Sequence, residues 1–427
     1  MKLQLAKGMS DSSPSEMISL QRTMNFLRDT FEKYGFVPFD TPAIERFDIL
    51  SAKYAGGSEI LKETFKLKDQ GDRELGLRYD LTVPFARFIG MNPMLKLPFK
   101  RYHMAKVWRD GPIGLGRFRE FWQCDVDILG SKKMSADAEI LELASSVFNE
   151  LDMSVLISVN NRKLLNGLLD VAGISNKEEV ILIIDKLKKV KIEELYAELK
   201  SVGVDKLTAD KVFDFFNVSG NNKEKLAKLK EVVVSEEGKQ GISELFDLFD
   251  YLDAYNVNNY ELDLSLSRGL NIYTGTVFEI TLINSEVKSS VASGGRYDKV
   301  VSQFLNSKNE YPCVGISFGL SRLSVAFSKD DFDSLTQVFV VPLVDDKSCL
   351  HVVKDLRNQG LRVETDIIGR NLNKNLNYAN SKKIPFVVFV GEDELKKGLF
   401  KLKNMSSGEE EFLSPKDISK KVLSVLN

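Results

Sequence analysis

The apolar positions near the start of the chain repeat with the period of an α-helix. They fall three and four residues apart, which places them on one helix face, and they are Met17, Leu20, Met24, Leu27, Phe31 and Tyr34. Just before them, Ser13-Pro14-Ser15-Glu16 has the form of a capping box, and a proline in the first turn loses no hydrogen bond. The pattern predicts a helix that begins there, ends near Gly35 and packs on another element.

The pattern changes to short alternating segments, broken by glycine and proline, between Phe36 and Leu129. This is typical of an antiparallel sheet rather than of βαβ units. The clearest strand is Phe121–Ile128, along which the side chains alternate between two faces. The apolar face holds Trp122, Cys124, Val126 and Ile128, and the other holds Gln123, Asp125 and Asp127. We expect one face to pack and the other to be free to hold a polar ligand.

Helical spacing of Leu, Lys, Glu and Val dominates residues 163–255. The sheet pattern returns at Glu261, where Leu262, Leu264 and Leu266 alternate with polar residues, and it continues to about Phe327. The helical block is therefore expected to interrupt one domain as an insertion.

A different alternation follows the acidic stretch at residues 328–333. Apolar strands at Val338–Val341, Arg362–Glu364 and Pro385–Val390 alternate with helical segments, of which the first lies near His351–Asn358. Buried strands that alternate with helices predict a small α/β domain with largely parallel strand pairing.

Composition narrows the possible classes of protein. The 427 residues, 43% of them hydrophobic, are enough for two or three packed domains. Lys plus Arg (59) nearly balances Asp plus Glu (61), so the overall charge gives no argument for binding nucleic acid or membranes. Three isolated cysteines and two histidines lack the spacing of a zinc site. With neither a signal peptide nor a membrane span in the sequence, we expect a cytoplasmic protein without structural metal.

Candidate chemistry gathers in two segments, Leu266–Glu279 and Gly294–Asp298. They place Arg268, Arg296, Tyr273 and Tyr297 beside glycine turns, where fixed positive charge can meet a phosphate and a phenol can select a small polar ligand. This combination suggests that the protein activates a small substrate with a nucleotide.

A second basic segment lies between two expected strands. Its glycines at Gly111–Phe118 imitate a P-loop, but Arg and Phe stand where Lys and Ser or Thr are needed, so we reject that motif. As a β-hairpin, the segment would instead carry Arg109, Arg117 and Arg119, which can grip a triphosphate through charge-assisted hydrogen bonds.

The segments Leu266–Glu279 and Gly294–Asp298 resemble the two signature segments of histidyl-tRNA synthetases. Leu77–Pro84 resembles a further histidine-specific segment, and Lys100–Asp127 resembles motif 2 of the class II synthetases, in wording closest to the archaeal and eukaryotic branch. Motif 1 is similar to Phe36–Glu45, with Pro42 as its proline, and motif 3 to Gly315–Leu323. Matched segments in order make an accidental resemblance improbable. The chain departs from the family pattern at Asn271, Ile272 and Ser321.

The resemblance implies a role for each candidate residue. The catalytic residues would be Arg268 and Arg109, and ATP would be bound by Arg109, Arg117 and Arg322. Histidine would be bound by Asp80, Thr82, Gln123, Asp127, Ile272, Tyr273 and Tyr297. It also implies ATP as substrate, Mg²⁺ with the nucleotide, tRNA(His) as acceptor and a homodimer.

Each of these residues also has an ordinary structural explanation. Arg109 and Arg322 taken singly are more often surface ion-pair partners, and Asp80 and Asp127 could be turn or strand-edge carboxylates. Arg268 fits such an explanation less well, because it continues the leucine face of its expected strand and would there need a buried anion.

The implied fold class is α+β: a class II synthetase-type antiparallel sheet with flanking helices, a helical insertion and a C-terminal α/β anticodon-binding-type domain. The expected division is 1–162 and 256–327 for the catalytic domain, 163–255 for the insertion, 328–336 for a linker and 337–427 for the last domain. The expected function is a histidine–tRNA ligase. Two alternatives stay open: a non-catalytic paralogue that senses histidine or tRNA as a regulatory subunit, and a ligase that activates histidine for another acceptor.

Overall fold

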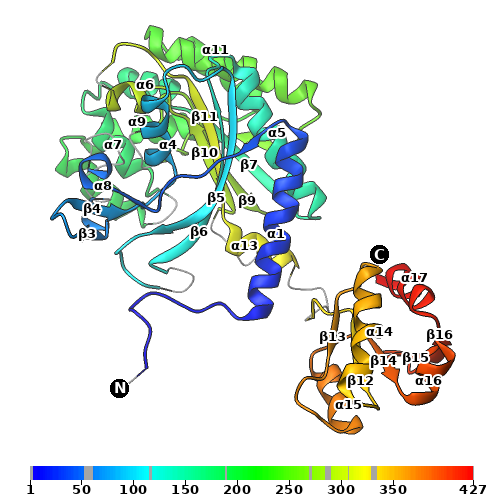
Figure 1. The fold of residues 1–427 in the computed structure, drawn as a ribbon. Coiled ribbons are helices and arrows are strands. Elements are labelled where there is room, and N and C mark those ends of the chain that lie inside the picture. The colour runs from blue at the N-terminus through cyan, green and yellow to red at the C-terminus, as the bar shows by residue number, and fades with distance from the viewer. Residues whose placement is uncertain are drawn as a thin grey trace. The chain divides into compact units, whose positions relative to one another are not determined.

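The structure is a computed structural model, and it describes residues 3–51, 61–114, 118–187, 190–268, 272–283, 290–305, 307–327 and 334–426. The chain forms two compact units (Figure 1): Met1–Asp11 with Leu20–Phe327, and Ser12–Ser19 with Ser328–Asn427. Among the helices of the described ranges, none has both the length and the apolar character that a membrane span requires.

The first helix, α1 (Pro14–Lys33), confirms the capping-box prediction. The Ser13 amide donates to Glu16 Oε2 at 2.7 Å, and the Glu16 amide donates to Ser13 Oγ at 3.3 Å. The helix stops before Gly35, whose φ of 76° continues no right-handed helix. Its apolar stripe is buried at Leu20, Met24, Leu27 and Phe31.

The core of the first unit is an eight-stranded sheet with the strand order β1-β5-β6-β11-β10-β9-β7-β8. Its strands, in chain order, are β1 (Val37–Pro38), β5 (Phe99–Trp108), β6 (Glu120–Leu129), β7 (Val155–Asn161), β8 (Tyr260–Leu262), β9 (Thr276–Leu282), β10 (Ala292–Arg296) and β11 (Cys313–Phe318). The sheet is antiparallel, as expected, except at its two edges, where β1 pairs with β5 and β7 with β8 in parallel.

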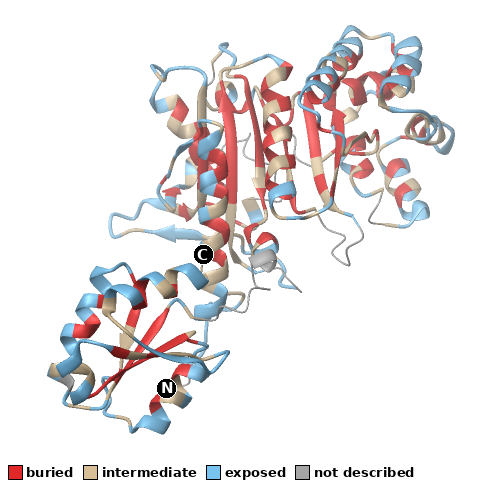
Figure 2. Cartoon of the chain, turned by 90° about the vertical axis from the view of Figure 1, so that its right-hand side faces the viewer, coloured by how far each residue is buried: buried red, intermediate tan, exposed pale blue. Residues whose placement is uncertain are grey.

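Smaller elements surround this sheet. A three-stranded sheet is formed by β2 (Ile44–Arg46), β4 (Glu74–Leu77) and β3 (Lys66–Lys68). Outside the insertion, the described residues of the first unit also form α2 (Phe47–Leu50), α4 (Thr82–Met91), α5 (Met134–Glu150), α12 (Val300–Phe304) and α13 (Leu320–Phe327). Figure 2 shows buried residues concentrated along the central strands and on one side of the helices.

The helical insertion is confirmed between β7 and β8. It consists of α6 (Arg162–Val171), α7 (Lys177–Ile184), α8 (Ile192–Ser201), α9 (Lys206–Phe216), α10 (Asn222–Val232) and α11 (Glu236–Ala254). Helices α6 to α9 share an apolar core, which includes Leu169, Val180 and Leu195.

The prediction of a strand from Glu261 through Leu266 is wrong beyond Leu262. Strand β8 ends at Leu262, and the Leu266 amide donates to the Asp263 carbonyl in a turn. The alternating leucines are nevertheless buried, because the turn packs on the core. Arg268 therefore does not continue a strand face; it has a φ of 46°, in the left-handed region that suits a turn.

The second unit contains a five-stranded sheet with the order β13-β12-β14-β15-β16. Its strands are β12 (Val338–Pro342), β13 (Val363–Thr365), β14 (Phe386–Val390), β15 (Phe400–Asn404) and β16 (Glu410–Leu413), and its helices are α14 (Asp346–Asn358), α15 (Leu372–Ser381), α16 (Glu392–Lys397) and α17 (Pro415–Leu426). The pairs β12–β13 and β12–β14 are parallel, as expected. The antiparallel strands β15 and β16, which extend the sheet beyond β14, were not predicted.

Candidate active site

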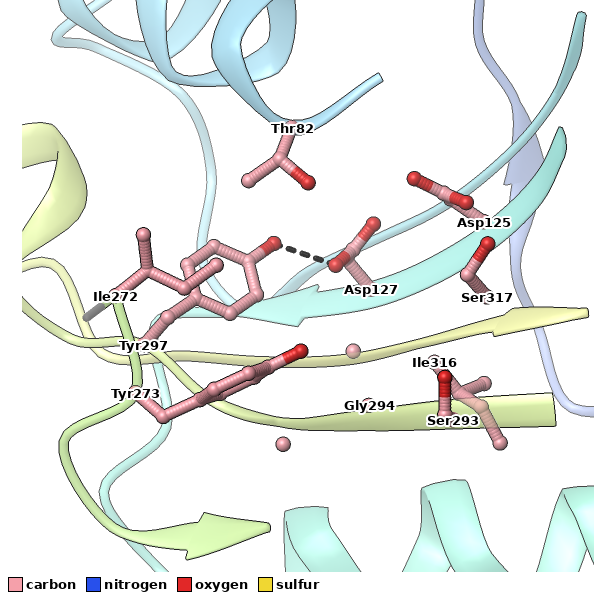
Figure 3. A pocket seen from close by; sticks show the side chains of 12 residues that line it. Thr82, Asp125, Asp127, Ile272, Tyr273, Ser293, Gly294, Tyr297, Ile316 and Ser317 are labelled. Atoms are coloured by element: carbon pink, nitrogen blue, oxygen red, sulfur yellow. Dashed lines mark hydrogen bonds between the residues drawn. The ribbon is translucent and has the colours of Figure 1, made fainter. Parts of the chain in front are cut away.

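A pocket lies where three neighbouring strands of the large sheet present polar residues in matching rows. Asp127 on β6 is opposite Gly315 on β11, which is opposite Gly295 on β10. One row further along, Asp125 is opposite Ser317, which is opposite Ser293. Side chains directly across a sheet share a face. The pocket and the solvent at its mouth together occupy about 300 Å³, and the pocket is lined by Thr82, Asp125, Asp127, Ile272, Tyr273, Ser293, Gly294, Gly295, Tyr297, Gly315, Ile316 and Ser317 (Figure 3).

Two glycines provide the space that the larger pocket side chains occupy. A Cβ atom at Gly315 would lie 1.8 Å from Asp127 Oδ1, far inside van der Waals contact. A Cβ atom at Gly295, where φ is 156°, would lie 2.8 Å from the ring of Tyr273. Only glycine therefore fits at these points, which lets a carboxylate and an aromatic ring lie against the sheet.

Asp127 is buried between a cation and a phenol. Arg101 Nη2 on β5 lies 2.6 Å from Asp127 Oδ2, and the Tyr297 hydroxyl donates to Asp127 Oδ1 at 2.5 Å. Burial raises the pKa of Asp127, while the Arg101 guanidinium and the Tyr297 hydrogen bond act in the opposite direction. Burial, followed by the Asp127 charge, raises the pKa of Tyr297. Tyr297 therefore remains a hydrogen-bond donor at neutral pH.

Arg101 itself is fully buried, and its guanidinium lies 4.2 Å from the ring centroid of Phe85. Sequence reasoning did not assign it to the site. The available signal was alternation along Phe99–Trp108, but only the β5–β6 register, which pairs Arg101 with Asp127, turns that alternation into a contact.

Asp125 is the second carboxylate of the pocket, and sequence reasoning placed it on the polar strand face without giving it a role. Burial is the main cause that raises its pKa to about 7; the charge of Arg101 lowers it, and that of Asp127 raises it. The pocket thus contains one carboxylate with a cationic partner and one whose charge changes near neutral pH. Ser293, Ser317 and Gly315 are pocket residues that sequence reasoning also missed, because β11 pairs with β6, and β10 with β11, only in the folded sheet.

Replacing Asp125 by asparagine is expected to reduce the pH dependence of the protein's stability. The folded protein holds a proton on Asp125 up to about pH 7, whereas the unfolded chain loses it near its ordinary value of 3.8. Stability therefore falls as pH rises through this window. In thermal unfolding, Asp125→Asn should lose less Tm than the wild type between about pH 5 and about pH 8. Asp11→Asn, at an exposed carboxylate, is the control, and equal losses in all three proteins would contradict the assignment.

Five of the residues proposed from sequence for histidine binding meet in this pocket: Thr82, Asp127, Ile272, Tyr273 and Tyr297. Two others lie outside its lining. Asp80 Oδ1 accepts from the Val83 amide at 3.0 Å at the start of α4, and burial raises the pKa of Asp80. Gln123 Nε2 donates to Ser317 Oγ at 3.3 Å, so Gln123 contacts a lining residue.

The arginines proposed from sequence occupy different places around the pocket. The Arg268 guanidinium lies 5.3 Å from the ring centroid of the lining residue Tyr273. Arg109 Nε donates to the Tyr79 carbonyl at 3.1 Å, next to Asp80 in the chain. Arg322 is exposed near the start of α13 and donates to the Ser290 carbonyl. Arg117 lies outside the described residues, as does Asn271.

The sheet register places Arg109 and Arg322 at the same end of β6. Strand β5 ends where Trp108 pairs with Glu120, just before Arg109. Strand β11 ends where Phe318 pairs with Cys124, just before the turn that leads to Arg322. Both residues thus lie beyond the Asp125 row, toward the end of β6 that begins at Glu120.

Comparison with known proteins gives the same family over nearly the whole chain. The family model described as Histidyl-tRNA synthetase matches residues 8–323, and the model described as Anticodon binding domain matches residues 337–424. Histidine–tRNA ligase 1 of Bacillus cereus is 43% identical over 415 residues, covering 96% of this chain and 97% of its own. The histidine–tRNA ligase of Clostridium tetani is 37% identical and covers 97% of this chain and 96% of its own.

A solved structure of similar sequence has the same fold. The histidyl-tRNA synthetase of a Nostoc species superimposes with a TM-score of 0.87 at 32% identity, with 99% of each chain covered. These relatives are bacterial, so they do not support the archaeal or eukaryotic branch that the sequence suggested. On the match over residues 8–323 and on the identity to these relatives, the chain belongs to the histidyl-tRNA synthetase family.

Proposed function

We propose that this protein is a histidine–tRNA ligase, which activates L-histidine with ATP to histidyl-adenylate and then transfers histidine to the 3′ end of tRNA(His). The observation that carries the proposal is the pocket in which two carboxylates and two tyrosines surround a space, with Arg268 next to one of the tyrosines. A family match over the same residues supports it.

The pocket chemistry suits a ligand with an ammonium group and an imidazole ring. We propose that Asp127 accepts a hydrogen bond from the imidazole N–H and that Tyr273 contacts the imidazole ring. Thr82, Ile272 and Tyr297 would complete the wall of the pocket. Asp80 would contact the amino acid from the start of α4. Gln123 would contact it from the side of Ser317, to which it donates a hydrogen bond. A ligand without ring donors would leave buried polar groups unpaired, and this is an effective means of discrimination.

The activation step needs stabilisation of charge rather than a general base. The histidine carboxylate forms a bond to the α-phosphorus of ATP, the bond from that phosphorus to the bridging oxygen breaks, and pyrophosphate leaves. Negative charge grows on the non-bridging oxygens, where Arg109 and Arg268 would stabilise it, while Arg117 and Arg322 would bind the other phosphates. All the side chains proposed to contact the phosphates are arginines, whose guanidinium groups donate hydrogen bonds to phosphate oxygens and do not bind cations. Mg²⁺ is therefore assigned to the nucleotide, where it screens phosphate charge.

In the second step a terminal ribose hydroxyl of the tRNA attacks the carbonyl carbon of the adenylate, and AMP leaves. Residues 337–427 would contact the anticodon, residues 163–255 would form the insertion, 328–336 the linker, and 1–162 with 256–327 the catalytic domain. The region around Pro42 would belong to a homodimer interface in a cytoplasmic enzyme.

Aminoacylation of total tRNA with each of the twenty amino acids tests this function. We expect histidine alone to be attached, together with histidine-dependent exchange of pyrophosphate into ATP. Exchange without attachment would favour a ligase with another acceptor, and neither activity would favour a regulatory paralogue. The match of an anticodon-binding model and the presence of Arg268 support the catalytic alternative.

A further inference from the structure

Arg296 is a buried arginine at the end of β10 that neither lines the pocket nor has a role in the proposed chemistry. Its side chain is only 2% exposed, whereas its chain neighbours Gly295 and Tyr297 both line the pocket. A buried guanidinium must be paired to be tolerated, so its partners reveal what it holds together.

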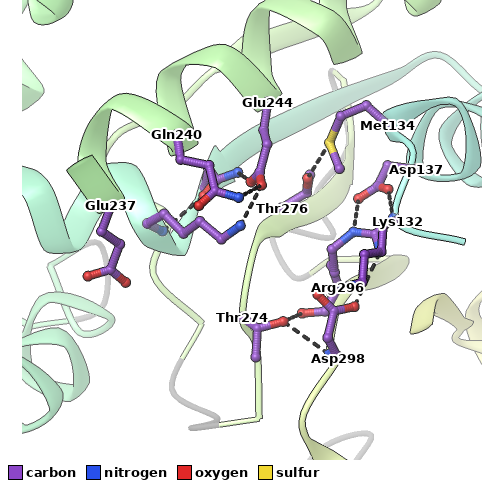
Figure 4. Close-up of polar contacts among 12 residues, drawn as sticks. Lys132, Met134, Asp137, Glu237, Gln240, Glu244, Thr274, Thr276, Arg296 and Asp298 are labelled. Carbon is purple, nitrogen blue, oxygen red and sulfur yellow. Dashed lines mark hydrogen bonds and ion pairs between the residues drawn. The ribbon is translucent and has the colours of Figure 1, made fainter. Parts of the chain in front are cut away.

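The partners of Arg296 use all five of its N–H donors. Nε donates to Asp137 Oδ1 at 3.3 Å and one Nη2 hydrogen to Asp137 Oδ2, in a two-point contact with the fully buried carboxylate on α5. Nη1 donates to the Ser131 carbonyl at 2.8 Å and to Asp298 Oδ1 at 3.2 Å. Nη2 also donates to the Lys133 carbonyl at 3.5 Å. Figure 4 shows Arg296 between Asp137 and Asp298.

Arg296 is also connected, through Thr274, to Tyr273, the other tyrosine of the pocket. The Thr274 amide donates to the Arg296 carbonyl at 2.8 Å, and the Asp298 amide donates to Thr274 Oγ1 at 3.0 Å (Figure 4). Thr274 directly follows Tyr273 in the chain. The residue after Tyr273 and the residues on both sides of Tyr297 are thus held at one point.

We propose that Arg296 is a positioning residue for the histidine pocket: with Asp137, Asp298 and Thr274 it forms a clamp that fixes Tyr273 and Tyr297. This inference rests on the proposed function and extends it to amino-acid specificity. The consequence reaches Asp127, because the Tyr297 hydroxyl donates to that carboxylate. If the clamp loosens, Tyr297 moves away from Asp127 and Tyr273 no longer keeps its place in the wall.

The test uses Arg296→Lys, which keeps the charge but cannot make the two-point contact, and Thr274→Val, which removes only the hydroxyl link. Exchange of pyrophosphate into ATP is measured with each substrate varied. We expect KM for histidine to rise roughly 10- to 100-fold in Arg296→Lys, since small displacements of binding groups are costly. In Thr274→Val we expect a smaller rise, and in both variants KM for ATP should stay within about twofold. Val180→Ala, in the core of the insertion, is the control that lowers Tm without changing either KM.

Two results would overturn the proposal. An Arg296→Lys protein with a lowered Tm and an unchanged KM for histidine would show a structural role only. An equal rise of both KM values would show general damage. If Arg296→Lys does not fold, the KM for histidine of Thr274→Val decides, and an unchanged value refutes the clamp. A wild-type protein without histidine-dependent exchange would refute the proposed function itself, which separates the two failures.

Discussion

Histidine-dependent exchange of pyrophosphate into ATP is expected to fall by about 10²- to 10³-fold in kcat when Arg268 is replaced by alanine. The proposed role of this guanidinium is to stabilise the charge that grows on the α-phosphate. Its position supports that role, because it lies 5.3 Å from the ring centroid of Tyr273 on the pocket wall. KM for histidine should change little, since the interaction belongs mainly to the transition state.

The controls for Arg268→Ala separate charge from folding. Arg268→Lys keeps the positive charge but not the planar fork, so we expect partial activity. Arg357→Ala is the matched control in the second unit: Arg357 donates to the Val363 carbonyl, as Arg268 donates to the Phe278 carbonyl, and its loss should leave exchange normal. Wild-type exchange by Arg268→Ala would remove Arg268 from the proposed chemistry.

Replacing Arg101 by methionine is expected to lower the free energy of unfolding by about 3–5 kcal/mol at neutral pH. The variant leaves Asp127 buried without its cation, while methionine roughly fills the space beside Phe85. The pKa of Asp127, already raised by burial, would rise further. The folded variant would then bind a proton that the unfolded chain lacks, so the destabilisation should grow as pH rises and shrink as pH falls.

Urea denaturation of the single and double variants checks this result. Arg101→Met/Asp127→Asn should be more stable than Arg101→Met, because the unpaired charge is gone. Lys100→Met is the control on the same strand: its partly exposed ion pair with Glu139 should contribute no more than about 1 kcal/mol. A double variant as unstable as Arg101→Met would mean that the Arg101–Asp127 charge pair is not the cause.

Local features of the fold could be predicted from the sequence because they depend on near neighbours. The capping box at Ser13 and Glu16, the strand that contains Asp125 and Asp127, and the helical insertion are confirmed. The strand expected through Leu266 failed because alternation of leucines reports burial on one side, and a turn packed on the core produces the same burial as a strand.

The sequence by itself determined the family, the helical insertion and five of the residues that line the pocket, because sequence motifs and periodicity are properties of short segments. Only the tertiary structure decided that Arg101 faces Asp127, that Gly315 leaves space for this carboxylate, and that Arg296 joins the segments of Tyr273 and Tyr297. These contacts depend on the register between paired strands, where a shift of one residue would turn each side chain to the other face.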